Sequence, residues 1–379
     1  MDIRRLQQEA LAKALKPQKV TILLGARRVG KSVLLQNFLS AYKRPYLFLN
    51  GEDQTTHQLL IERSVKNYTR VLNGNDLLVI DEAQNIPDIG RKLKLMIDSF
   101  KGLKILVTGS SAFDMLNVSG EPLTGRSNNL ILYPLYQGEI GKYENALQTK
   151  QNLEERLIYG SYPELWHLPS LEDKRNYLIG MVNSYLLKDI LMLDGIRNAS
   201  IVSSLLQMIA YQIGKEVSYN EIGNALGISK NTVEKYLNLL TKVFVLYKVS
   251  AYSNNLRKEI SKSQRWYFID NGIRNAITGD FNPLSLRRDD EKGMLWENYL
   301  FMERLKRNTY RNYFPRYYFW RTYDQQEIDL LEEYDKKLHA FEFKFSPKKL
   351  PKKPAAFSKA YKKAAFEVVT STNYPDFIL

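Results

Sequence analysis

Short, continuous apolar runs alternate with amphipathic stretches over the first third of the chain. Continuous apolar, β-branched runs predict buried strands, and apolar positions at helical spacing predict the helices between them. The predicted strands are Val20 to Leu24, Pro45 to Asn50, Asp76 to Glu82, Lys104 to Thr108 and Asn129 to Leu135. The predicted helices are Met1 to Leu15, Val33 to Tyr42 and Ile89 to Phe100. This alternation predicts an α/β domain built on a parallel sheet.

The remainder of the chain carries mainly helical patterns first and strand patterns later. The predicted helices are Leu153 to Tyr159, Arg175 to Leu193, Tyr219 to Leu226, Lys230 to Leu240, Arg287 to Arg307 and Ala355 to Lys363. The predicted strands are Val243 to Ala251, Trp266 to Ile269, Tyr317 to Tyr323, Gln326 to Glu333, Lys337 to Phe345 and Phe366 to Thr370. We therefore expect a helical segment, a helix pair with a β-hairpin, and a C-terminal α/β module.

Composition narrows the class of protein. A length of 379 residues suggests two to four domains. The net charge of +14 favours a polyanionic partner such as nucleic acid, although basic proteins without such a partner are common. The absence of cysteine excludes disulfides, thiolate metal sites and cysteine nucleophiles. With a polar N-terminus and no apolar run near the roughly 18 residues of a membrane span, we expect a cytoplasmic protein without membrane contact.

A glycine-bounded loop follows the first predicted strand. Gly25-Ala26-Arg27-Arg28-Val29-Gly30-Lys31-Ser32 fits the pattern G-x-x-x-x-G-K-[ST], and the predicted strand and helix flank it as the motif requires. Glycines let successive backbone N–H groups point at phosphate oxygens, and the helix start adds partial positive charge. Lys31 can reach the β- and γ-phosphates of ATP, while the Ser32 hydroxyl can ligate Mg²⁺.

Two acidic residues end the third predicted strand. Asp81 stands at the strand tip, where it can hold Mg²⁺, and Glu82 follows it directly. Glu82 can polarise the attacking water as a general base. With the phosphate-binding loop and an extra strand before it, this pair resembles the Walker B element of AAA+ type P-loop ATPases.

The AAA+ resemblance implies further site residues. A polar residue at the end of the fourth strand would contact the γ-phosphate or water; Ser110 is the match, with Thr108 and Ser111 left open. Arg126 resembles the arginine finger that serves a neighbouring subunit, which would imply a homo-oligomer; a plain surface arginine is the alternative. Pro163, in Gly160 to Pro163, resembles the turn by which a helical lid touches adenine, although an ordinary helix-ending turn has the same pattern.

Ser218 to Leu240 has the pattern of a helix-turn-helix. Gly227 marks the turn, Gly223 must be small where the helices meet, and Ser229 caps the second helix. With the β-hairpin that follows, the segment predicts a winged helix. Exposed residues of the second helix would contact DNA in a groove: Lys230, Asn231 and Lys235, with Glu234 beside them. Packing against protein is the alternative.

The C-terminal strands carry a charged constellation. Asp329 lies on one predicted strand, Glu342 and Lys344 share one face of the next, and Glu297 lies on the preceding helix. The arrangement is similar to the PD-(D/E)xK restriction-endonuclease-like fold, in which the carboxylates bind Mg²⁺ and the lysine assists hydrolysis. A half-buried edge strand has the same alternation, and degenerate members of that fold are frequent.

The whole chain resembles uncharacterised prokaryotic AAA+ type ATPases with a winged helix and a C-terminal endonuclease-like domain. The expected domains are residues 1–140 (ATPase core), 141–200 (helical lid), 201–275 (winged helix-turn-helix) and 285–379 (nuclease-like). We expect an ATP-hydrolysing, Mg²⁺-dependent protein. In one hypothesis its nucleotide state controls a DNA-directed nuclease. In the other, the protein is a nucleotide-dependent switch that binds DNA or a protein partner.

Overall fold

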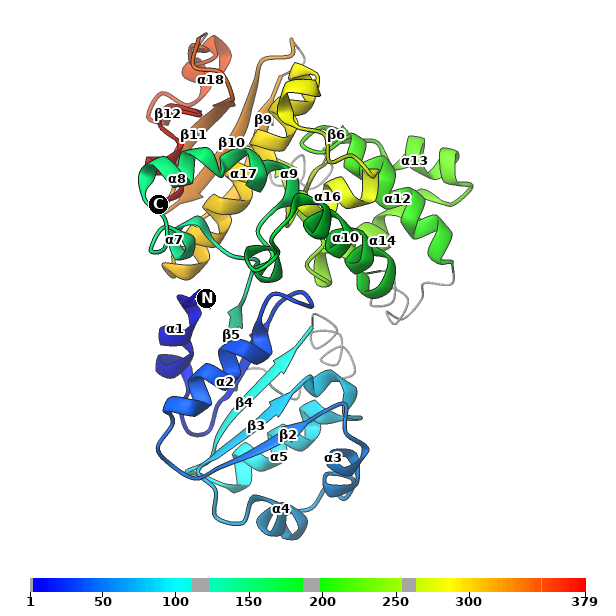
Figure 1. Cartoon of the computed structure of the whole chain (residues 1–379), viewed down its shortest axis with the longest axis vertical. Coiled ribbons are helices and arrows are strands. Elements are labelled where there is room, and N and C mark those ends of the chain that lie inside the picture. The colour runs from blue at the N-terminus through cyan, green and yellow to red at the C-terminus, as the bar shows by residue number, and fades with distance from the viewer. Residues whose placement is uncertain are drawn as a thin grey trace. The chain divides into compact units, whose positions relative to one another are not determined.

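The computed structural model describes residues 3–110, 123, 125–186, 198–253, 264–322, 324–348 and 350–379. The chain forms two compact units (Figure 1). The first comprises residues 2–133 with 242–244, and the second comprises residues 134–241 with 245–379. Among the described residues, no helix has the length and apolar character needed to traverse a bilayer.

The N-terminal unit is built on a parallel, five-stranded sheet in the order β2-β3-β4-β1-β5. The strands are β1 (Val20–Leu24), β2 (Tyr46–Asn50), β3 (Leu77–Asp81), β4 (Lys104–Gly109) and β5 (Ser127–Ile131). The prediction of an α/β domain with a parallel sheet is confirmed. The last strand lies slightly earlier than the apolar pattern indicated, because the strand ends at Ile131 and the apolar residues Leu132 and Tyr133 after it have no regular secondary structure.

Helices cover both faces of this sheet. They are α1 (Gln7–Ala14), α2 (Lys31–Ala41), α3 (Gln54–Leu59), α4 (Val65–Leu72) and α5 (Ile89–Ser99). Side chains of α4 and α5 pack with Val20, Ile22 and Leu24 in one apolar core. Alternation puts Thr21 on the opposite face, where its hydroxyl donates to the carbonyl of Ala14 at the end of α1 (3.1 Å). Both α3 and α4 lie in a stretch for which the sequence pattern predicted no element.

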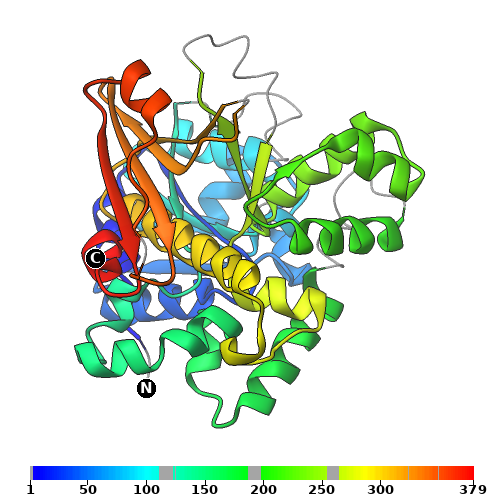
Figure 2. The same ribbon diagram turned by 90° about the horizontal axis from the view of Figure 1, so that it is seen from above.

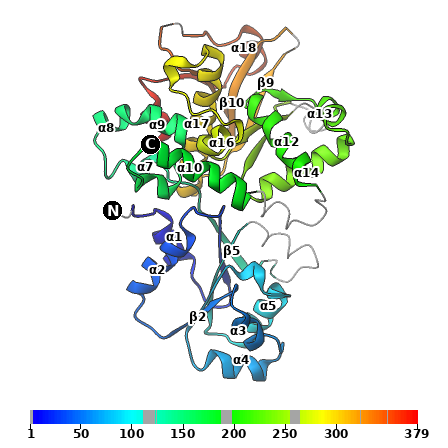
Figure 3. The ribbon, with the colours of Figure 1, turned by 45° about the vertical axis from the view of Figure 1, so that its right-hand side comes forward.

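The second unit begins with short helices and then contains a helix pair. Its first helices are α7 (Gln137–Ile140), α8 (Ala146–Gln151), α9 (Leu153–Tyr159) and α10 (Leu171–Met181), with a π-helical turn at Val182–Leu186. The end of the predicted helix, residues 187–193, lies outside the described residues. Next come α12 (Ala199–Tyr211), α13 (Tyr219–Leu226) and α14 (Lys230–Lys242), which lie together in Figure 3.

The turn between α13 and α14 has the local geometry that the sequence indicated. Gly227 adopts φ 67°, and the Ser229 hydroxyl accepts a hydrogen bond from the Thr232 N–H (3.1 Å). A Cβ on Gly223 would lie 2.7 Å from the Ile228 carbonyl oxygen, so the close approach of the turn to α13 excludes any side chain there.

The hairpin after α14 and the C-terminal strands form one seven-stranded sheet in the order β12-β11-β10-β9-β7-β8-β6. The strands are β6 (Glu216–Val217), β7 (Leu246–Ala251), β8 (Gln264–Phe268), β9 (Arg316–Arg321), β10 (Glu327–Tyr334), β11 (Lys337–Lys344) and β12 (Ala365–Thr370). Parallel pairing of β7 with β9, through Ser250 with Tyr318 and Ala251 with Phe319, joins the two groups of strands. Residues of the hairpin and of the C-terminal module therefore share one sheet surface.

The remaining helices of this unit are α16 (Asn271–Thr278), α17 (Asp289–Tyr310), α18 (Ala355–Ala360) and α19 (Tyr374–Ile378). The long helix α17 contacts both β8 and β11, and it lies across the strands in Figure 2. Because α17 spans the join between the hairpin and the C-terminal strands, side chains on this helix can meet residues from both.

Candidate functional sites

The loop Gly25 to Gly30 leaves β1 and leads directly into α2. Arg28 and Gly30 have positive φ values of 66° and 93°, which turn the backbone sharply before Lys31. A Cβ on Gly25 would lie 2.2 Å from the Leu132 carbonyl oxygen, so the neighbouring chain excludes a side chain at the start of the loop. Packing thus requires the first glycine, and backbone conformation favours the second.

Lys31 is held at this loop by the loop's own backbone. Its ammonium donates to the carbonyl oxygens of Gly25 (3.0 Å) and Ala26 (3.1 Å) and lies 3.8 Å from Glu82 Oε1. The Lys31 side chain is 4% exposed. A buried ammonium with carbonyl acceptors is positioned to exchange them for phosphate oxygens.

Asp81, at the end of β3, accepts two hydroxyl hydrogen bonds. Ser32 Oγ donates to Asp81 Oδ2 (2.8 Å), and Thr108 Oγ1 donates to Asp81 Oδ1. The Glu82 N–H donates back to Thr108 Oγ1 (2.9 Å). The structure therefore brings together the predicted Mg²⁺ ligands Ser32 and Asp81, and it fixes the carboxylate from the β4 side through Thr108.

Glu82 stands on a left-handed backbone conformation, φ 49°. Non-glycine residues seldom adopt this region, and such strain is concentrated at functional sites. The Gln84 amide donates to Glu82 Oε2 (2.5 Å), which orients the carboxylate. A Cβ on Gly51 would lie 2.3 Å from the Glu82 carbonyl oxygen, so the turn after β2 must also be glycine.

The remaining candidates of this unit are Ser110, Ser111 and Arg126. Ser110 follows β4 and is buried, whereas Ser111 lies outside the described residues. Arg126 precedes β5 and hydrogen-bonds through its carbonyl to the N–H of Val20, at the start of β1 (2.9 Å). Because the strands are parallel, Arg126 lies at their amino ends, whereas the phosphate-binding loop lies at their carboxyl ends. The Arg126 side chain is half exposed and pairs with Asp98 (3.1 Å).

Sequence reasoning missed one buried residue that touches the loop. The Arg5 guanidinium donates to the carbonyl oxygens of Val29 (2.7 Å) and Tyr133 (2.6 Å) and is buried. It therefore ties the phosphate-binding loop to the end of the sheet. In the sequence, Arg5 and Arg4 are adjacent basic residues in a polar stretch, and no local signal distinguishes them.

The turn Gly160 to Pro163 lies in the second unit and is fixed by a buried carboxylate. Asp270 Oδ2 accepts from the Ser161 N–H (2.7 Å), and Asp270 Oδ1 accepts from the Gly272 N–H (2.8 Å). Gly160 has φ 76°, and a Cβ there would lie 1.8 Å from Asp270 Oδ1. Pro163 opens a short 3₁₀ helix, Pro163–Trp166. These contacts, all within the second unit, account for the conformation of the turn.

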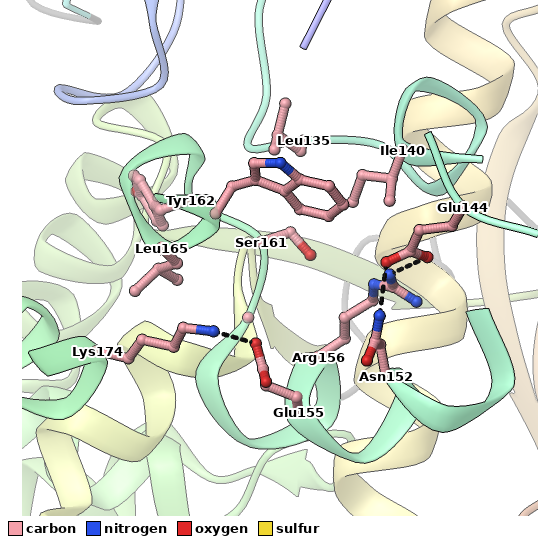
Figure 4. Close-up of a pocket in the computed structure, with 12 residues that line it drawn as sticks. Leu135, Ile140, Glu144, Asn152, Glu155, Arg156, Ser161, Tyr162, Leu165 and Lys174 are labelled. Atoms are coloured by element: carbon pink, nitrogen blue, oxygen red, sulfur yellow. Dashed lines mark hydrogen bonds and ion pairs between the residues drawn. The ribbon is translucent and has the colours of Figure 1, made fainter. Parts of the chain in front are cut away.

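A cavity of about 270 Å³ adjoins this turn and includes Gly160, Ser161 and Tyr162 in its wall. Figure 4 shows Lys174 directed toward Glu155, and Arg156 directed toward Glu144. The four charged side chains of the wall are therefore satisfied as two ion pairs.

The predicted DNA-contacting residues lie on one exposed surface of α14. Lys230, Asn231 and Lys235 are exposed and Glu234 is half-buried, while Val233 and Leu237 are buried beneath them. This arrangement is compatible with contact to a polyanion along the first turns of the helix.

The four predicted residues of the C-terminal constellation lie close to one sheet surface. Lys344 Nζ is 3.0 Å from Glu342 Oε1, and Asp329 Oδ2 accepts from the N–H of Phe343 (2.8 Å). Glu297, Asp329 and Lys344 line a cavity of about 1320 Å³. The Tyr267 hydroxyl, from β8, donates to Glu297 Oε1 (2.6 Å).

Burial and crowding disfavour negative charge on these acids. Desolvation, followed by repulsion from Asp329, raises the pKa of Glu297 to about 8 and the pKa of Glu342 to about 7. Desolvation also raises the pKa of Asp329.

A cation that sequence reasoning did not include lies among these acids. Arg265, on β8, approaches Glu327 (2.9 Å), Glu297 (3.7 Å) and Asp329 (3.9 Å), and its side chain is 4% exposed. Over the part of the chain that is described, no three acidic or histidine side chains are placed to hold one metal ion. The pairing of β7 with β9, which no local pattern reveals, carries Arg265 to this position.

Three family models match successive parts of the chain. Residues 17–141 match an AAA domain, residues 150–284 a domain of unknown function (DUF8612), and residues 292–375 a second domain of unknown function (DUF4143). The N-terminal part is thus similar to AAA domains, in agreement with the predicted resemblance.

Curated relatives similar over most of the chain are uncharacterised proteins. Those of Mycobacterium tuberculosis and Mycobacterium bovis are 28% identical over 344 residues, covering 90% of this chain and 74% of each relative. A protein of Haemophilus influenzae is 26% identical over 313 residues, covering 76% of this chain and 74% of that protein. A solved Walker-type ATPase of Pyrococcus abyssi has a TM-score of 0.51 at 18% identity, covering 73% of this chain and 98% of that one. The structural likeness concerns the fold.

Proposed function

We propose that this protein binds ATP with Mg²⁺ at the loop Gly25 to Ser32 and hydrolyses it. The observation that carries the proposal is the contact of Ser32 Oγ with Asp81 Oδ2 (2.8 Å), beside the buried ammonium of Lys31. A hydroxyl and a carboxylate are the oxygen ligands that Mg²⁺ prefers, so these residues fit the ion. When bound, Mg²⁺ supplies charge neutralisation at the β- and γ-phosphates.

The chain's own groups have separate tasks in this proposal. Lys31 exchanges its carbonyl acceptors for phosphate oxygens, and the loop N–H groups hold the remaining phosphate charge. Glu82, oriented by Gln84, accepts a proton from the attacking water. Thr108 keeps Asp81 in place during turnover.

Calorimetry with ATP and Mg²⁺ tests the proposal. Wild type should bind, Lys31→Ala should lose binding, and Lys43→Ala, an exposed lysine just after α2, should bind as wild type. Glu82→Gln should retain binding and stop phosphate release. Absence of ATP binding by wild type, or normal hydrolysis by Glu82→Gln, would contradict the assignment.

The nucleotide state controls one of two activities of the second unit. The first is a metal-dependent nuclease at Glu297, Asp329 and Glu342, and the second is the binding of DNA or a protein partner; we call these the nuclease output and the binding output. The Arg265 guanidinium among these acids favours the binding output. We therefore propose a nucleotide-dependent switch that contacts DNA through the exposed surface of α14.

Two assays separate these outputs. Supercoiled plasmid with Mg²⁺ or Mn²⁺ should stay intact with wild type and with Lys344→Ala alike; cleavage that Lys344→Ala abolishes would establish the nuclease instead. In filter binding, the double variant Lys230→Ala, Lys235→Ala should retain less DNA than Lys359→Ala, which removes an exposed lysine on α18. Equal retention by the two variants would remove α14 from DNA contact.

A further inference from the structure

The resemblance to PD-(D/E)xK enzymes implies a divalent metal held by Glu297, Asp329 and Glu342, and the residues present do not fit one. With Arg265 in place, no such trio within the described ranges is arranged to share an ion. The carboxylates face an arginine instead: Arg265 Nη1 lies 3.7 Å from Glu297 Oε1 and 3.9 Å from Asp329 Oδ1. An ion bridging those two oxygens would have to lie beside a guanidinium of like charge.

The position of Arg265 is set by the sheet and not by a mobile loop. Its backbone pairs with Val249 on β7 and with Glu216 on β6. Its guanidinium packs over the Phe319 ring, 4.4 Å from the centroid, and forms its shortest ion pair with Glu327 (2.9 Å). A side chain fixed by backbone register, ring contact and ion pair cannot leave without disturbing the core.

Arg265 also cannot lose its positive charge by deprotonation. A guanidinium stays protonated at every pH at which a protein folds, unlike a lysine ammonium or a histidine. The buried acids need a counter-charge, because an unpaired buried carboxylate is costly. When Glu297 or Asp329 is ionised, Arg265 supplies that charge, and Lys344 supplies it when Glu342 is ionised.

We propose that Arg265 is the resident counter-ion of this acid cluster and that it excludes divalent metal from the nuclease-like cavity. The cluster then stabilises the joint between the hairpin after α14 and the C-terminal strands, because Arg265 comes from the hairpin and its acidic partners come from α17 and β10. The inference rests on the binding output proposed above and is independent of the ATP site.

Manganese binding to the full-length chain without nucleotide tests the inference. An Asp81→Asn background removes the carboxylate of the other proposed cation site. In that background, adding Glu297→Gln should leave Mn²⁺ binding unchanged, because Glu297 holds no Mn²⁺ while Arg265 is in place. Binding is measured by calorimetry or by the decrease in the electron paramagnetic resonance signal of free Mn²⁺. Adding Arg265→Gln should create one saturable site, at least about tenfold tighter than any background binding. Adding Glu297→Gln to that variant should abolish the site.

Three further variants separate charge from packing. Arg265→Lys keeps the charge and should bind no Mn²⁺, and Arg321→Gln, which breaks the Glu216 pair at the same cavity (3.1 Å), should resemble its parent. If Arg265→Gln does not fold, the double variant Arg265→Gln, Glu327→Gln removes an opposite charge together with the arginine and should gain the site. Manganese bound with Arg265 in place and lost on Glu297→Gln overturns the inference, as does a folded Arg265→Gln protein that gains no site.

Discussion

The hydroxyl of Thr108 donates a hydrogen bond to the carboxylate of Asp81, and the same oxygen accepts from the N–H of Glu82. One side chain on β4 thus links Asp81, the last residue of β3, to Glu82, which follows it. Asp81 is held on its other oxygen by Ser32, so neither rotation nor retreat of the carboxylate is possible without breaking a hydrogen bond. The relationship makes Thr108 the positioning residue of the proposed ATPase site.

Replacing Thr108 by valine should slow ATP hydrolysis by about tenfold or more while leaving nucleotide affinity much less affected. Valine matches threonine in shape but removes the hydroxyl, so Asp81 and the Glu82 N–H lose their common partner. Steady-state phosphate release and calorimetric affinity measure the two effects separately. Ser110→Ala is the matched control, and a larger loss of turnover in Ser110→Ala than in Thr108→Val would give the role to Ser110.

Arg5→Ala should destabilise the N-terminal unit and weaken ATP binding. The variant leaves the carbonyls of Val29 and Tyr133 without their buried donor, at a cost of about 1–3 kcal/mol for each unsatisfied group. Thermal melting with and without Mg²⁺ATP measures both effects. Arg4→Ala, in which the lost side chain is exposed and pairs with Glu9, should melt and bind as wild type. Equal behaviour of the two variants would exclude a specific role for Arg5.

Arg126→Ala should lower ATP turnover by at least about tenfold without lowering affinity if the arginine serves a neighbouring subunit. Arg126 lies at the amino ends of the strands, away from the phosphate-binding loop of its own chain. Its exposed ion pair with Asp98 contributes less than about 1 kcal/mol, so folding should be unchanged. Asp98→Ala removes the same ion pair and is the control. Mixing Arg126→Ala with Lys31→Ala protein should restore part of the activity; unaltered turnover in Arg126→Ala would leave it a surface arginine.

Gly160→Ala should prevent folding of the second unit or lower its melting temperature strongly. The new Cβ would stand 1.8 Å from Asp270 Oδ1 on a backbone with φ 76°, which combines a clash with backbone strain of about 1–3 kcal/mol. Gly180→Ala, within α10, meets no atom within 4 Å and should stabilise its helix by about 0.5–1 kcal/mol. Differential scanning calorimetry distinguishes the two. A Gly160→Ala protein that melts as wild type would show that the Asp270 contact is dispensable.

The second unit should lose stability as pH rises from about 5 to 9. Burial holds the pKa of Glu297 at about 8 and that of Glu342 at about 7 in the folded chain, against 4.5 for an ordinary glutamate. Because the folded pKa is the higher one, protonation stabilises the fold; this contribution is complete below pH 4.5 and is lost as pH rises through these values. Glu297→Gln should flatten the dependence of melting temperature on pH, and an unchanged slope would contradict the assignment.

The sequence by itself determined the strands of the ATPase sheet and the phosphate-binding loop. Both are local patterns: buried parallel strands need continuous apolar runs, and Gly25 to Ser32 form one unbroken stretch of backbone. The turn at Gly227 and the cap at Ser229 were predictable for the same reason. Local patterns also identified Glu342 and Lys344 as neighbours on one strand face.

Only the tertiary structure decided which distant residues meet. Thr108 and Ser110 are both small polar residues at a strand end, and the register of β3 against β4 decides which hydroxyl reaches Asp81. Arg265 reaches Glu297 and Asp329 because β7 pairs with β9 across a long stretch of chain. Such contacts depend on how whole helices and strands pack together. The residues that neighbour each partner in the sequence do not indicate this packing.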